Sequence, residues 1–215
     1  MPYKAAIFDI SGTLVHSTPE YRHKMVGKAI DSLGGRYTTG DIDRFWFETG
    51  RKEIIEKCFG LDCREFWKIF RQMDNMDLRR EHSYAYDDTD FVQQLKQSGV
   101  KVGAVTGAPP KIADLEIGLV GKHYFDYIVV ASEVKGSVEK PDPRPLLECT
   151  ESLGVPACDC LYIGNSEEDV LTARNANITD VLIRRGEHNF PHVRPTILID
   201  SLYELRIMFS LQYPD

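Results

Sequence analysis

The sequence predicts an α/β protein: a three-layer, doubly wound parallel-sheet core with an inserted all-helical domain. Three observations support this prediction. From residue 87 onward, short apolar runs alternate with helical segments, as in strands joined by crossover helices. A further apolar run, Ala5–Phe8, lies near the start of the chain. Between these parts, from about residue 16 to residue 84, apolar residues recur at helical spacing.

The first element is expected to be a buried strand that ends at Asp9. The run before Asp9 is short and apolar, and Gly12 follows in a tight turn. An unpaired buried charge is costly, so Asp9 should face a cation, a ligand or N–H donors. From this stretch alone, an Asp that merely caps a turn remains the alternative. Gly12 permits a close approach of the backbone, and Thr13 can donate its hydroxyl.

Residues 16–84 are expected to form a small helical domain. Its first helix has a start signal at residues 17–20, which combine a capping pair with a proline in the first turn. Three more helical stretches follow, and their aromatic residues are most simply core residues. We therefore expect residues 1–15 and 85–215 to form the sheet domain, interrupted by this helical one.

The remaining strands of the sheet are expected at residues 100–105, 127–131, 161–163, 181–183 and 196–199, with helices between them and a last helix after Ser201. Ligands of such sheets bind at the carboxyl ends of the strands, near the strand where the order reverses. Asp9, Thr106 and Asn165 each stand at a strand's carboxyl end. Their convergence favours a functional role for Asp9 over a turn cap.

The composition excludes several classes of protein. With 215 residues, 42% hydrophobic and 27% charged, the chain has the balance of an ordinary soluble globular protein. The net charge of −7 argues against a nucleic-acid or anionic-membrane surface. No apolar stretch approaches the ~20 residues of a membrane span, and no signal peptide is visible, which favours the cytoplasm. The five cysteines are irregularly spaced, so reduced thiols are expected rather than a zinc site.

Four stretches, in order, resemble the motifs of the haloacid dehalogenase-like (HAD) hydrolase superfamily. Residues 9–14 (DISGTL) resemble Asp-x-Asp-Gly-Thr-Leu, and the apolar strand ending in Thr106-Gly107 resembles the second motif. The third motif, Lys-Pro-Asp-Pro, is intact at residues 140–143, and residues 164–169 (GNSEED) resemble Gly-Asp-Ser-x-x-Asp. Each motif is weak alone, but four at the expected spacing are specific. The resemblance implies a Rossmann-like core with the helical cap of subfamily I.

The resemblance also implies a reaction. In the phosphatases of this superfamily the first Asp attacks phosphorus, and water hydrolyses the resulting aspartyl-phosphate. This assigns Asp9 as the nucleophile. The family's cofactor is Mg²⁺, which brings the two anions together. By the family pattern its ligands would be Asp9, the backbone carbonyl of Ser11 and Asn165, with Asp169 in support.

The same pattern implies a substrate site. Thr106 and the backbone amides of Gly12 and Gly107 would hold phosphoryl oxygens, beside the hydroxyl of Thr13. Lys140 would add a positive charge, although a solvated surface Lys is the usual fate of this residue type. In relatives of this size a cap loop faces the site, which makes Arg51 a candidate for substrate specificity. A surface Arg at a helix start is the alternative for Arg51.

Two positions depart from the family pattern. Ser11 stands where the phosphatases carry a second Asp, the general acid and base, whose loss typically costs ~10²–10⁴ in rate. Asn165 replaces an anionic metal ligand by a neutral one, which weakens metal binding.

The sequence therefore predicts a Mg²⁺-dependent phosphatase for a small phosphomonoester, with turnover weakened by Ser11. A 2-haloacid dehalogenase-type hydrolase and a low-turnover phosphate-binding or regulatory protein are the alternatives. The expected partner is a small anionic, phosphorylated metabolite, with no nucleic acid and no membrane. The protein is expected to be a monomer or a homodimer.

Overall fold

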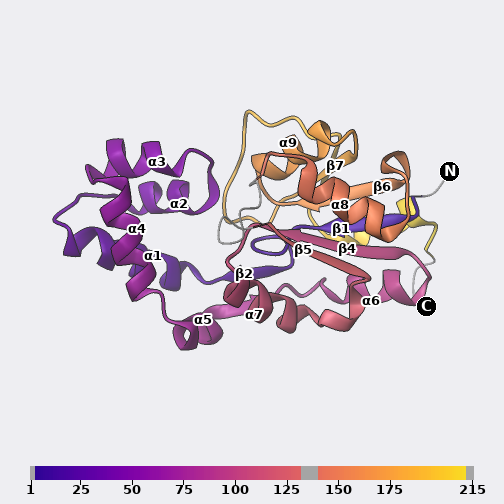
Figure 1. The fold of residues 1–215 in the computed structure, drawn as a ribbon, viewed down its shortest axis with the longest axis horizontal. Helices are drawn as coiled ribbons and strands as arrows, with labels where there is room; N and C mark the ends of the chain where they lie inside the picture. The colour runs from indigo at the N-terminus through magenta and orange to yellow at the C-terminus, as the bar shows by residue number, and fades with distance from the viewer. Residues whose placement is uncertain (1–2, 132–139, 212–215) are drawn as a thin grey trace. The chain divides into compact units, whose positions relative to one another are not determined.

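The computed structural model describes residues 3–131 and 140–211 of the chain. The chain divides into two compact units, one made of Met1–His16 and Tyr84–Asp215 and the other of Ser17–Ser83. The first unit contains a six-stranded sheet and its covering helices, and the second unit is helical (Figure 1). The predicted α/β class with a helical insertion is thus confirmed. That the second unit acts as a cap stays a prediction.

The large sheet is parallel throughout, in the order β5-β4-β1-β6-β7-β8. Its strands are β1 (Ala5–Phe8), β4 (Lys101–Thr106), β5 (Tyr127–Val130), β6 (Cys160–Gly164), β7 (Thr179–Ile183) and β8 (Ile197–Ile199). The chain runs outward from β1 through β4 to β5, then returns to the other side of β1 for β6, β7 and β8. The order therefore reverses at β1, and the loops after β1, β4 and β6 meet at one place.

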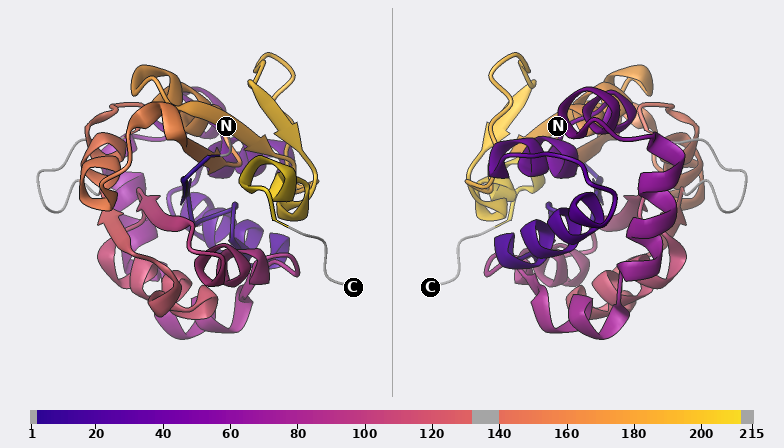
Figure 2. Two further views of the ribbon diagram at one scale, coloured as in Figure 1. Left: turned by 90° about the vertical axis from the view of Figure 1, so that its right-hand side faces the viewer. Right: turned by 90° about the vertical axis from the view of Figure 1, so that its left-hand side faces the viewer.

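Helices cover both faces of this sheet (Figures 1 and 2). One face packs against α6 (Asp90–Gln97), α7 (Pro110–Val120) and the 3₁₀ helix η5 (Leu202–Phe209), and the other against α8 (Arg144–Leu153) and α9 (Glu167–Asn175). Two short 3₁₀ turns, η2 (Lys122–Tyr124) and η4 (Ala157–Asp159), precede β5 and β6. Side chains of a strand alternate between faces. In β1, Ala6 and Phe8 therefore enter one core, and Ala5 and Ile7 the other.

The second unit consists of α1 (Pro19–Ser32), α2 (Thr39–Phe47), α3 (Arg51–Glu53), the π-helix η1 (Ile54–Phe59), α4 (Cys63–Met73) and α5 (Met76–His82). Its helices begin at the expected kind of residue: the Asp62 carboxylate caps α4 by accepting from the backbone N–H of Arg64 and Glu65. Phe66 and Phe70 of α4 are buried in the core of this unit, as their pattern predicts.

A two-stranded sheet and the helix α5 were not among the predicted elements. Strands β2 (Val15–Ser17) and β3 (Ser83–Ala85) form a two-stranded sheet that the sequence did not indicate, because three residues are too few to show alternation. The last helix, expected after Ser201, is the 3₁₀ helix η5. All five cysteines are free thiols. Among the described residues, every helix is too short or too polar to cross a bilayer.

Candidate active site

Asp9 lies directly beyond β1, at the centre of the sheet's carboxyl edge. Its backbone N–H donates to the Ile163 carbonyl at 2.9 Å, which extends the pairing of β1 with β6 by one residue. The residue is 6% exposed, and its Oδ2 accepts a hydrogen bond from the Thr13 hydroxyl at 2.9 Å. The neighbouring strand thus fixes the backbone of Asp9, and its own loop fixes the side chain.

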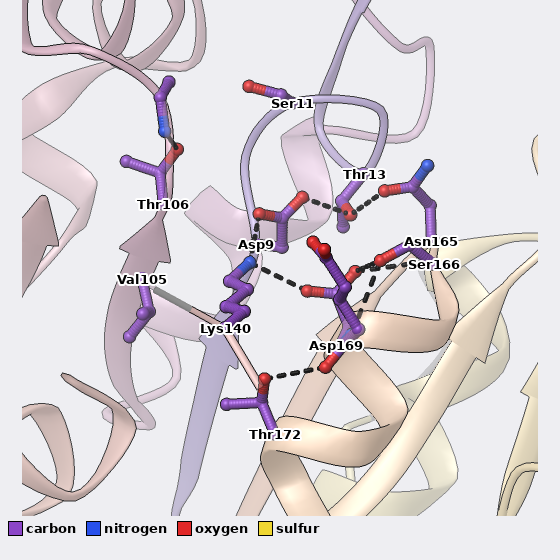
Figure 3. A network of polar contacts seen from close by, with 12 residues as sticks. Asp9, Ser11, Thr13, Val105, Thr106, Lys140, Asn165, Ser166, Asp169 and Thr172 are labelled. Carbon is purple, nitrogen blue, oxygen red and sulfur yellow. Dashed lines mark hydrogen bonds and ion pairs between the residues drawn. The ribbon is translucent and has the colours of Figure 1, made fainter. Parts of the chain in front are cut away.

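Lys140 holds two carboxylates at once. Its Nζ donates to Asp9 Oδ1 at 2.6 Å and to Asp169 Oδ1 at 2.8 Å (Figure 3). The Lys140 side chain is 8% exposed. Burial alone would lower its pKa, but the charges of Asp169 and Asp9 outweigh burial and hold the pKa well above its ordinary value. Lys140 is therefore a fixed positive charge beside Asp9 and Asp169, and its role toward a substrate stays a prediction.

The electrostatic balance at Asp9 is different. Burial raises its pKa to about 6, the charge of Asp169 adds to this, and Lys140 and the Thr13 hydroxyl oppose it. Without a further cation, the ionised form of Asp9 therefore predominates only above about pH 6.

Asp169 is fixed by the start of α9. Its Oδ2 accepts from the backbone N–H of Ser166 at 3.1 Å and from the Ser166 hydroxyl at 2.7 Å, in a capping box. Its Oδ1 accepts from the Tyr162 hydroxyl at 3.2 Å as well as from Lys140. A Cβ on Gly164 would lie 2.2 Å from the Cβ and Cγ of Asp169, so glycine is required for this packing. Tyr162 was not predicted from the sequence, although a tyrosine in a buried apolar strand is a signal because its hydroxyl needs a hydrogen-bond partner.

Asn165 lies against the loop that follows Asp9. The Thr13 hydroxyl is 3.1 Å from Asn165 Oδ1 and also donates to Asp9, so both oxygens lie within reach of one hydroxyl (Figure 3). Gly12 has a φ of +82°, and a Cβ there would lie 2.5 Å from Asn165 Nδ2. Only glycine suits both the left-handed backbone and this close approach.

The side-chain oxygens of Asp9 and Asn165 are suited to Mg²⁺, which prefers oxygen ligands. The Asp9 carboxylate oxygen and the Asn165 amide oxygen both lie beside the Thr13 hydroxyl. Thr13 belongs to the loop after β1, which also carries the Ser11 carbonyl. The described part of the chain contains no cluster of three His, Cys, Asp or Glu side chains that could hold a metal. A magnesium ion at this edge would therefore depend on neutral oxygens in addition to Asp9.

Thr106 ends β4 and is fully buried. Its carbonyl accepts from the N–H of Ala131 at 2.8 Å, and its Oγ1 accepts from the N–H of Ala108 at 3.2 Å. A hydroxyl that accepts in this way keeps its own proton to donate, which suits an anion. The next residue, Gly107, is exposed, at the turn between β4 and α7.

Ser11 has a partner that the sequence did not reveal. Its hydroxyl donates to Glu116 Oε2 at 2.5 Å. Glu116 lies on the buried side of α7, among Ala113, Ile117 and Val120, and is itself 3% exposed. A charged residue on the apolar side of an amphipathic helix was the available signal.

Arg185, just after β7, is a second missed residue. Its Nε and Nη2 donate to the Thr13 carbonyl at 3.0 and 2.6 Å, and its Nη1 donates to Asp88 Oδ2 at 3.0 Å. Its side chain is 8% exposed. Arg185 thus fixes the backbone of the residue whose hydroxyl reaches Asp9 and Asn165.

Arg51 belongs to the second unit. Its Nε donates to the Phe45 carbonyl at 3.1 Å and its Nη2 to the Trp46 carbonyl at 3.5 Å. These bonds satisfy carbonyls at the end of α2, which an Arg near a helix C-terminus often does. Its role in substrate specificity stays a prediction.

The comparison with known proteins agrees with this geometry. A family model described as haloacid dehalogenase-like hydrolase matches residues 3–177. The chain belongs to this family. The resemblance of its four motifs is thus confirmed, and the fold and the enzyme class agree with it.

Among its relatives, this HAD-like hydrolase is 28% identical to a glyceraldehyde 3-phosphate phosphatase of Methanopyrus kandleri, over 94% of this chain and 98% of that one. It is 26% identical to a phosphoglycolate phosphatase of Psychrobacter arcticus, over 100% of this chain and 99% of the relative. A crystal structure of a HAD phosphatase from Thermococcus onnurineus superposes with a TM-score of 0.68 at 26% identity, covering 95% and 97% of the two chains.

Proposed function

We propose that this protein is a Mg²⁺-dependent phosphatase that hydrolyses small phosphomonoesters through an aspartyl-phosphate on Asp9. The observation that carries the proposal is the contact of Lys140 with both Asp9 and Asp169 at the sheet's reversal point. A buried carboxylate held beside a fixed ammonium group is suited to attack an anion. The names of the two curated relatives support the same class of substrate.

The roles follow from the contacts. Asp9 attacks phosphorus, with its side chain oriented by Thr13 and Lys140. Lys140 neutralises the negative charge that gathers as nucleophile and phosphate meet. The Thr106 hydroxyl and the amides of Gly12 and Gly107 are proposed to hold the phosphoryl oxygens.

Asp9, Asn165 and the Ser11 carbonyl would hold Mg²⁺, with Asp169 in support. When bound, the ion supplies further charge neutralisation. We further propose the second unit as the source of substrate specificity, with Arg51 as the candidate contact, and a small phosphorylated acid or aldehyde as the substrate. The cytoplasm is the proposed compartment, since a reducing environment suits five free thiols.

A substrate panel tests the proposal. The protein is assayed for phosphate release from 2-phosphoglycolate, glyceraldehyde 3-phosphate and 4-nitrophenyl phosphate, with Mg²⁺ and with a chelator. We expect release that requires Mg²⁺ and that falls at least 10²-fold in Asp9→Asn, because an amide keeps the shape of Asp9 but cannot attack. Halide release from 2-haloacids with chelator present would instead support the dehalogenase alternative. Activity retained by a folded Asp9→Asn protein would remove Asp9 from its role.

A further inference from the structure

Ser11 and Glu116 form a hydroxyl–carboxyl pair that joins the loop after Asp9 to helix α7. Ser11 follows Asp9 by two residues and donates to Glu116 Oε2 at 2.5 Å. Ser11 is exposed, whereas Glu116 is 3% exposed. Figure 3 shows Ser11 on the loop after Asp9, outside the dashed network that joins Asp9 to Lys140. The pair thus connects a buried carboxyl group to an exposed residue on the nucleophile's own loop.

The proposed reaction needs such a group. Cleavage of an alkyl phosphate leaves an alkoxide that must gain a proton, and the attacking water must later lose one. The carboxyl group that shares Lys140 with Asp9 is held in place by three residues: Asp169 accepts from Lys140, Tyr162 and Ser166. Lys140 itself, paired with two carboxylates, is a poor proton donor.

A serine hydroxyl alone holds its proton too tightly to serve as a base near neutral pH. A hydroxyl that is hydrogen-bonded to a carboxyl group can pass a proton on, by the same logic that activates a serine beside a base. The 2.5 Å contact between Ser11 Oγ and Glu116 Oε2 provides this arrangement.

We propose that Glu116 acts through Ser11 as the acid–base partner of phosphate transfer, with Ser11 Oγ as the atom that meets the substrate. This inference rests on the proposed phosphatase function. It assigns to a buried carboxyl group of α7 the proton transfers that Ser11 cannot perform alone.

Two steps complete the cycle. In the first, Asp9 Oδ forms a bond to phosphorus and the bond from phosphorus to the leaving oxygen breaks. For this step Glu116 starts protonated and donates to Ser11 Oγ. The leaving oxygen takes the proton of Ser11 Oγ, Ser11 Oγ takes the proton of the Glu116 carboxyl group, and Glu116 becomes a carboxylate that accepts from the Ser11 hydroxyl, the direction of the hydrogen bond in the structure. In the second, a water oxygen bonds to phosphorus as its proton passes to Ser11 Oγ and the hydroxyl proton of Ser11 passes to Glu116. The bond from phosphorus to Asp9 then breaks, and every group returns to its starting state.

The dependence on the leaving group tests this role in the Mg²⁺-loaded enzyme. With 2-phosphoglycolate the leaving oxygen needs a proton, whereas 4-nitrophenolate leaves without one. We expect Glu116→Gln and Ser11→Ala each to lower kcat on 2-phosphoglycolate by ~10²-fold or more, with KM unchanged. The double variant should be no worse than either single one, because the two residues act as a unit.

With 4-nitrophenyl phosphate the first step should survive in both variants. Rapid-mixing measurements should show a burst of about one nitrophenolate per enzyme, followed by slow turnover, because hydrolysis of the aspartyl-phosphate also needs the pair. Asp114→Asn is the matched control, since it removes a carboxylate from an exposed position of the same helix and should change neither rate. Ser11→Ala carries the test if Glu116→Gln does not fold, as Ser11 is exposed.

The outcomes separate the two proposals. A burst of nitrophenolate that is slowed as much as kcat on 2-phosphoglycolate would overturn the role of Glu116, and so would a double variant whose loss is the product of the single losses. In either case the burst itself upholds the chemistry of Asp9. Absence of burst and turnover in the unaltered protein would overturn the proposed function, and the inference with it.

Discussion

Lys140 Nζ lies 2.6 Å from Asp9 Oδ1, and the same ammonium group lies 2.8 Å from Asp169 Oδ1. Three side chains from three parts of the chain thus form one buried ion cluster. It consists of the carboxylates of Asp9 and Asp169 and the ammonium group of Lys140. Removing one member of a buried ion pair typically costs about 3–5 kcal/mol, because the remaining charge is left without compensation. The triad therefore contributes to stability as well as to chemistry.

Replacement of Lys140 should show both effects. Lys140→Met is expected to lower kcat/KM for phosphate release at least 10²-fold, because two carboxylates then repel the phosphate. It should also lower the free energy of unfolding by about 3–5 kcal/mol. Steady-state kinetics and urea denaturation measure the two effects. Lys111→Met, at an exposed position of α7, is the matched control and should leave both unchanged. Activity within tenfold of the original in Lys140→Met would contradict this role.

The raised pKa of Asp9 predicts how metal-free stability depends on pH. The folded protein keeps a proton on Asp9 up to about pH 6, whereas the unfolded chain releases it near 3.8. The free energy of unfolding should therefore fall by on the order of 3 kcal/mol as the pH rises between these two values. Above them it should no longer depend on Asp9. The Asp9→Asn protein has no ionisable side chain at position 9, so it should lack this pH dependence.

Urea denaturation of both proteins in chelator, from pH 4 to pH 8, measures the effect. The free energy of unfolding of the original protein minus that of Asp9→Asn should fall by on the order of 3 kcal/mol between pH 4 and pH 7. A difference that stays constant, or that rises with pH, would show that Asp9 is not destabilised by burial. Added Mg²⁺ should weaken the dependence, because the ion competes with the proton for Asp9.

Arg185 should control how well the site binds magnesium. Its two hydrogen bonds to the Thr13 carbonyl fix the residue whose hydroxyl reaches Asp9 and Asn165. Lysine keeps the charge but cannot donate in a planar fork. Arg185→Lys is therefore expected to raise the Mg²⁺ concentration for half-maximal activity by roughly tenfold, as changes to groups that orient metal ligands typically do. Arg184→Lys is the control, since that side chain is 52% exposed and pairs with Asp200. The same Mg²⁺ dependence in both variants would contradict the prediction.

The sequence predicted those parts of the site that stand at strand ends. Asp9, Thr106 and Asn165 could be assigned to one place because the carboxyl ends of parallel strands meet where the strand order reverses. The sheet itself followed from alternating apolar runs, which local patterns reveal. The short strands β2 and β3 could not be predicted in this way, because three residues are too few to show an alternation of apolar and polar side chains.

The missed residues act through contacts between distant parts of the chain. Ser11 and Glu116 are 105 positions apart, and Thr13 and Arg185 are 172 apart. Such pairs depend on how helices and strands pack, and no local pattern specifies that packing. Ser11 itself was recognised as a departure, but its partner on α7 required the structure.

A last prediction concerns an acid placed directly on the loop. Asp at position 11 would carry its own carboxyl group and would no longer need Glu116. In the Glu116→Gln background, Ser11→Asp is therefore expected to raise turnover of 2-phosphoglycolate by ~10²-fold, which restores what the single variant lost. In the unaltered background the gain should be much smaller, because Glu116 already supplies a carboxyl group and two adjacent carboxyl groups hinder each other's ionisation. Steady-state rates of the four proteins measure both gains. An equal ~10²-fold gain in both backgrounds would mean that Glu116 contributes nothing through Ser11, and that the original protein works without an acid at this position.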